Sequence, residues 1–108
     1  MATAGELHPT EGIRLLLERE RVEEDGGRAI YRATIYTPTS SFCFDALLQR
    51  GAGAELNPRD PDAVVDPIHQ KRLNNLLGSI ARAAERKHTD GLPPWPERVM
   101  RWRGPGRG

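Results

Sequence analysis

Two runs of strand-forming residues flank a tight turn near the start of the chain, and this pairing constrains the fold more than any other feature. The runs are IRLLLERERV (residues 13–22) and RAIYRATIYT (residues 28–37), on either side of Asp25-Gly26-Gly27. Alternating strands around Asp-Gly predict an antiparallel β-hairpin. A three-residue loop places opposite charges across from each other, because it pairs Glu20 with Arg32 and Glu24 with Arg28. We therefore predict this register, with a positive φ at Gly27.

A third strand and one long helix follow the hairpin. Residues 41–49, SFCFDALLQ, alternate in polarity as a strand does. After a loop rich in Gly, Pro and Asp, Asp66-Pro67 is typical of a helix N-cap with proline in the first turn. The helix is predicted to end near His88, before Thr-Asp-Gly and Pro-Pro. The predicted fold is α+β: a three-stranded antiparallel sheet (β-β-β), one long amphipathic helix, and a short docked C-terminal helix or segment.

The length of 108 residues predicts a single domain. Residues 1–12 lack periodicity and are expected to form a mobile arm, residues 13–103 the α+β domain, and residues 104–108 a frayed tail. The N-terminal residues do not resemble a signal peptide, and no apolar run is long enough to cross a membrane. A cytoplasmic protein with no membrane partner is therefore expected.

The predicted sheet has two unequal faces. One face is clearly apolar and is covered by the helix residues Leu73, Leu76, Leu77, Ile80, Ala83 and Ala84. The other face carries a smaller apolar set that needs cover: Leu16, Val22, Ile30 and Tyr36. The C-terminal segment offers Trp95, Val99, Met100 and Trp102 for that purpose. We therefore expect this segment to dock on the outer face of the sheet.

Charge is distributed unevenly along the chain. Residues 1–70 hold seven Arg and Lys against twelve Asp and Glu, a net charge of −5, whereas residues 71–108 hold nine against three, a net charge of +6. Such asymmetry favours contacts with charged partners. The outward side of the helix and the C-terminus supply the candidate partner or polyanion face: Lys71, Arg72, Asn75, Ser79, Arg82, Arg86, Arg101, Trp102 and Arg103.

The sequence argues against catalysis and against a bound metal or cofactor. His69 and His88 stand at opposite ends of the predicted helix, and no Cys pair is present. Cys43 has no histidine placed near it to act as a base. Gly51-Ala52-Gly53-Ala54 lacks the Gly-Lys-Ser/Thr ending of a phosphate-binding loop. No catalytic, cofactor-binding or metal-binding residue is predicted, and the chain is not expected to be an enzyme.

Two functions therefore compete. The first is a small non-catalytic module that binds another protein, as an adaptor or as a homodimer paired through its sheet. The alternative is a nucleic-acid-binding protein that uses the basic side of the helix and the Arg/Trp-rich C-terminus. The order of three strands and a basic helix resembles that of double-stranded RNA-binding domains, although the N-terminal helix and basic motif of that family are missing here.

Overall fold

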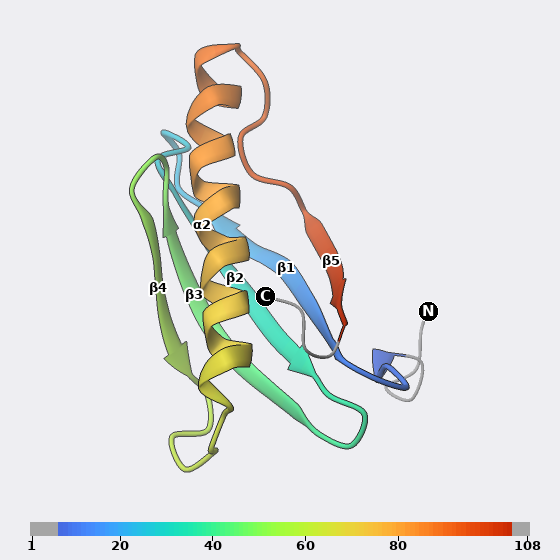
Figure 1. Cartoon of the computed structure of the whole chain (residues 1–108). Coiled ribbons are helices and arrows are strands. Elements are labelled where there is room, and N and C mark those ends of the chain that lie inside the picture. The colour runs from blue at the N-terminus through green and yellow to red at the C-terminus, as the bar shows by residue number, and fades with distance from the viewer. Residues whose placement is uncertain (1–6, 105–108) are drawn as a thin grey trace.

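The computed structural model describes residues 7–104, which form one helix and a five-stranded antiparallel sheet (Figure 1). The strand order is β4-β3-β2-β1-β5. The elements are β1 (Ile13–Val22), β2 (Arg28–Tyr36), β3 (Ser41–Gln49), β4 (Gly53–Pro58), α2 (Pro67–Thr89) and β5 (Arg98–Arg103). The predicted α+β class, with one helix and an antiparallel sheet, is confirmed. The predicted number of three strands is wrong, because β4 and β5 extend the sheet at its two edges.

The β1–β2 register differs from the predicted one, yet it keeps the same side chains on the same face. Leu17 lies opposite Ala33, whereas a three-residue loop would place it opposite Ile35. The register is shifted by two residues. Because side chains in a strand alternate between the two faces with a period of two, most hairpin residues still lie on the face of the sheet that was predicted. At the turn, Gly26 rather than Gly27 takes the positive φ of 71°.

A β-bulge interrupts β1 between Arg19 and Arg21. Beyond it, Val22 lies opposite Ala29, a core residue on the helix-facing side. Directly opposite residues share a face of the sheet, so the bulge removes Val22 from the outer face where it was predicted.

The core lies between α2 and one face of the sheet. Its largest fully buried side chains include Tyr31 and Phe44 from the sheet and Leu73 and Leu77 from α2. Ala81 is buried, whereas the predicted core residue Ala83 is half-buried. The helix begins as expected, with Asp66 accepting a hydrogen bond from the Ile68 amide. Among the described residues, no helix is long and apolar enough to cross a membrane.

Part of the N-terminal segment lies against the outer face of the sheet. His8 Nδ1 lies 2.6 Å from the Thr37 carbonyl oxygen, and its ring meets Tyr36 edge-on with centroids 5.2 Å apart. The indole of Trp102 donates to the Glu11 carbonyl at 3.0 Å. These contacts hold residues 8–11 of the predicted mobile arm on the sheet. Residues 1–6 of that arm, and residues 105–108 of the predicted frayed tail, lie outside the described residues.

Candidate functional site

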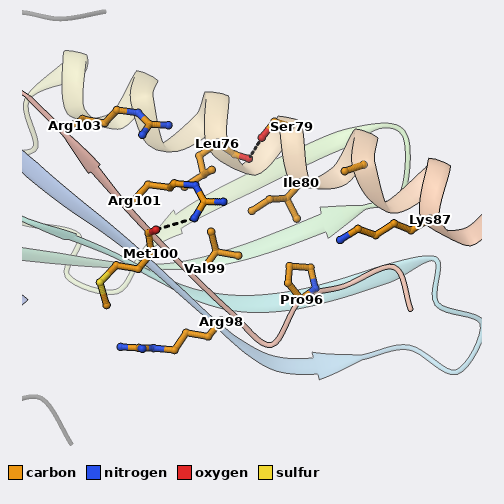
Figure 2. Close-up of a pocket in the computed structure, with 11 residues that line it drawn as sticks. Leu76, Ser79, Ile80, Lys87, Pro96, Arg98, Val99, Met100, Arg101 and Arg103 are labelled. Atoms are coloured by element: carbon orange, nitrogen blue, oxygen red, sulfur yellow. Dashed lines mark hydrogen bonds between the residues drawn. The ribbon is translucent and has the colours of Figure 1, made fainter. Parts of the chain in front are cut away.

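A groove runs between α2 and the edge strand β5, with a volume of about 490 Å³ (Figure 2). We call it the α2–β5 groove. On the helix side its lining recurs at helical spacing: Leu76, Ser79, Ile80, Ala83 and Lys87. The other side is formed by the segment that leads into β5 and by β5 itself, through Pro96, Arg98, Val99, Met100, Arg101 and Arg103.

The floor of the α2–β5 groove is apolar. Leu76, Ile80 and Val99 line it, and each keeps a small exposed surface while contributing to the core. Ala83 and Pro96 continue the apolar surface on either side. A ligand that presented apolar groups here would gain burial at about 25 cal/mol per Å².

The rim of the groove is cationic. Every charged residue that lines it is basic: Lys87 from α2, and Arg98, Arg101 and Arg103 from β5. No Asp or Glu among the described residues belongs to this lining. Figure 2 shows Arg101 and Arg103 reaching from the strand toward the helix, while Arg98 and Met100 point to the opposite side. The site therefore combines an apolar floor with positive charge, which favours an anionic ligand that also carries apolar groups.

Two arginines of the rim bind the backbone of their own strand. Arg101 Nη1 donates to the Met100 carbonyl at 2.8 Å, and Arg103 Nη1 donates to the Trp102 carbonyl at 3.1 Å. Both acceptors belong to β5, which has β1 as its neighbour on one side only within the described sheet. The guanidinium groups therefore protect the edge of the sheet in this conformation.

The structure divides the predicted basic face into two parts. Ser79, Arg101 and Arg103 line the α2–β5 groove, and Arg72 donates to the Gly104 carbonyl at 3.2 Å near the end of β5. A second part remains exposed along α2 without lining the groove: Lys71, Asn75, Arg82 and Arg86. We call these four residues the helix stripe.

Trp102 does not lie with its arginine neighbours. Successive side chains of a strand point to opposite faces, so Arg101 and Arg103 face the helix side while Trp102 lies on the outer face. There it is half exposed, opposite Arg14 of β1. The structure thus separates the tryptophan from the arginines that sequence proximity had grouped with it.

The apolar outer face is smaller than predicted. Leu16 is only 3% exposed, between Thr34 on β2 and Met100 on β5. Tyr36 and Ile30 are half-buried on the same face, and Val22 has left it. Of the four C-terminal residues predicted to cover this face, Trp95 and Val99 instead join the core on the helix side. The spacing of these residues in the sequence could not predict their place in the core, because that place depends on β5 pairing with β1 as a strand.

A second hollow, of about 580 Å³, lies where β3 begins and β4 ends, and it is lined by Phe42, Phe44 and Val65 together with Arg59. Its cation is already engaged, because Arg59 Nη2 lies 3.0 Å from Glu20 and 2.7 Å from Asp45. The hydrogen bond with Asp45 raises the pKa of Arg59 above its ordinary value. This hollow therefore offers no comparable charge to a ligand.

Nothing in the described part of the chain forms a cluster of three or more His, Cys, Asp or Glu side chains able to hold a metal ion. Cys43 is half-buried, and its Sγ accepts a weak contact from Thr34 Oγ1 at 3.9 Å. No protein-family model, curated protein or solved structure matches this chain.

Proposed function

We propose that this chain is a small non-catalytic module that binds another protein, and that the α2–β5 groove receives an acidic segment of that partner. The observation that carries the proposal is the lining of the groove: nearly buried Leu76, Ile80 and Val99 lie beneath the cations of Lys87, Arg101 and Arg103, and no carboxylate of the described residues lines it. Acidic side chains match the rim, and apolar side chains of the same segment match the floor. Opposite charge also accelerates the encounter of the two partners.

The same features support a peptide more than a nucleic acid as the occupant of the groove. Single-stranded nucleic acids are held by bases stacked on aromatic side chains, each worth about 1–3 kcal/mol. None of the described residues that line the groove is aromatic. Trp95 is buried in the core, and Trp102 lies on the other face. An apolar floor, by contrast, suits aliphatic side chains of a peptide.

The proposal is tested with fluorescently labelled acidic peptides and fluorescence anisotropy at low salt. Arg101→Glu together with Arg103→Glu should weaken binding at least about tenfold, since about 1.4 kcal/mol is a factor of ten and two attractions become repulsions. The matched control is Arg21→Glu with Arg28→Glu, which makes the same charge change at the exposed hairpin end. Equal affinity in both variants, or no binding by the native protein, would contradict the proposal.

Nucleic-acid binding is the second candidate, and the helix stripe favours it. Lys71, Arg82 and Arg86 are exposed and take part in none of the ion pairs formed within residues 7–104. Such cations are suited to phosphate contacts, whose affinity falls steeply with salt. Mixed single-stranded and double-stranded oligonucleotides test this function in a mobility-shift assay. Retardation that disappears in Arg82→Glu/Arg86→Glu but persists in Arg101→Glu/Arg103→Glu would favour this alternative over the groove.

A further inference from the structure

We infer that the acidic partner segment binds in extended form as a sixth strand along the free edge of β5, with its carboxylates held by Arg101 and Arg103. This inference rests on the proposed function and adds the mode of binding. It depends on three features of β5: the direction of its backbone groups, the present contacts of its arginines, and the spacing of its side chains.

The pairing of β5 with β1 shows which backbone groups point outward. The Arg19 amide donates to the Glu97 carbonyl at 2.9 Å, just before β5 begins. In an antiparallel ladder such pairs recur at every second residue, so Val99, Arg101 and Arg103 direct their backbone groups toward β1. The amides and carbonyls of the alternate residues Arg98, Met100 and Trp102 then point away from the sheet, toward the space a sixth strand would occupy.

The groove reaches this edge of the strand. Its lining includes the consecutive residues Arg98, Val99, Met100 and Arg101, whose side chains alternate between the two faces of the sheet. Because the hollow is bordered by these four consecutive residues and by Arg103, it follows β5 along its length. A segment lying along the edge of β5 would therefore contact the apolar floor and the cationic rim together.

The arginines that now protect the edge also provide a way to open it. In the free protein they donate to the outward carbonyls of Met100 and Trp102. A carboxylate is a stronger acceptor for a guanidinium than a neutral carbonyl is. Carboxylates of the partner would draw both guanidinium groups away and leave the two carbonyls to accept from the partner's own amides. Acidic segments would thus be selected over neutral ones for strand addition.

The spacing of β5 specifies the pattern of the partner. Val99, Arg101 and Arg103 face the helix side at two-residue intervals, about 7 Å apart in a strand. The matching segment carries carboxylates at two alternate positions and an aliphatic residue at the third, which packs against Val99 and Ile80. A second copy of this chain paired through β5 is disfavoured, because it would bring the arginines of two β5 strands close together.

Two synthetic peptides provide the probe, one with this acid-x-acid-x-valine pattern and one with the reverse order, so that parallel and antiparallel addition are both sampled. For each, a second version carries N-methyl groups on the backbone amides that would pair with β5, with unchanged side chains and charge. We expect N-methylation to weaken binding at least about tenfold, the loss of about 1.4 kcal/mol.

The complementary variant is Met100→Pro, which removes one outward amide. An edge strand tolerates proline where the N–H faces away from its neighbour, so the fold should persist, as urea unfolding would show. Affinity that drops with N-methylation and in Met100→Pro supports strand addition. If peptides bind with unchanged affinity in both tests but lose it in Arg101→Glu/Arg103→Glu, strand addition is wrong and the proposed function stands. Absence of binding by either native peptide overturns both.

Discussion

The two tryptophans of the C-terminal segment differ sharply in burial, although they are only seven positions apart in the sequence. Trp95 is 2% exposed; its indole donates to the Gly26 carbonyl at 2.8 Å and its ring meets Tyr31 edge-on. Trp102 is 50% exposed. Trp95→Ala should lower the free energy of unfolding by about 3–5 kcal/mol, as for other buried aromatic residues. Trp102→Ala should cost roughly 1 kcal/mol. Urea unfolding measures both, and equal losses would contradict the assigned burial.

Tyr31 gives the protein a defined response to high pH. Burial raises the pKa of its phenol to about 12, while nearby Arg19 acts in the opposite direction. Since an unfolded tyrosine ionises near pH 10, the folded state retains this proton between about pH 10 and 12 while the unfolded state releases it. The contribution to stability is therefore complete below pH 10 and is lost as the pH rises toward 12.

Tyr31→Phe should remove most of the decrease in the free energy of unfolding between about pH 10 and 12. Urea unfolding of the native protein and of the variant at several pH values above and below pH 10 measures it. Burial also raises the pKa of the half-buried Tyr36, so Tyr36→Phe should remove a smaller part of the fall and retain the loss due to Tyr31. A native protein whose unfolding free energy stays constant from pH 10 to 12 would contradict this assignment.

Among the elements, the sequence was informative where side chains repeat regularly and misleading where neighbours determine the structure. The hairpin strands, β3 and α2 follow their apolar periodicity and cap signals. β4, with the sequence GAELNP, has few strand-forming residues and exists because β3 offers it an edge. The C-terminal segment was predicted to dock as a short helix or segment, but pairing with β1 makes RVMRWR a strand.

The candidate site was predictable only in part for the same reason. The excess of positive charge after residue 70 is visible in the sequence, and it does supply the rim of the groove. The groove itself requires α2 and β5 to lie side by side. Arg101 and Arg103 lie on the opposite face of the sheet from Trp102 only because β5 is a strand. Neither feature follows from local spacing.

β5 and the segment before it are expected to be part of the folding unit. The segment contributes Trp95 and Val99 to the core, and Tyr31 donates its hydroxyl to the Pro96 carbonyl. Ending the chain after Pro94 should therefore abolish cooperative thermal unfolding, because the loss approaches the total stability of about 5–15 kcal/mol typical of small domains. Circular dichroism would measure the transition. A truncated chain that melts cooperatively near the native temperature would show that β5 only rests on a complete core.

At the scale of the whole molecule, a homodimer paired through the sheet would have to use one of its two edge strands. The edge of β3 is covered by β4, so the sheet ends in β4 and β5. Two-fold pairing through β5 would bring like charges together. We therefore expect sedimentation at micromolar concentration and low salt to give one species near 12.0 kDa. A stable dimer that persists in Arg101→Glu/Arg103→Glu would indicate a different interface.

The most direct test of the central claim follows the backbone amides of β5 by hydrogen exchange in nuclear magnetic resonance spectra, with and without the acidic peptide. In the free protein, the outward amides of Arg98, Met100 and Trp102 should exchange faster than those of Val99 and Arg101, which face β1. Addition of peptide should protect the outward set and leave the inward set nearly unchanged. Saturating peptide that leaves the Met100 and Trp102 amides unprotected would contradict binding along this edge.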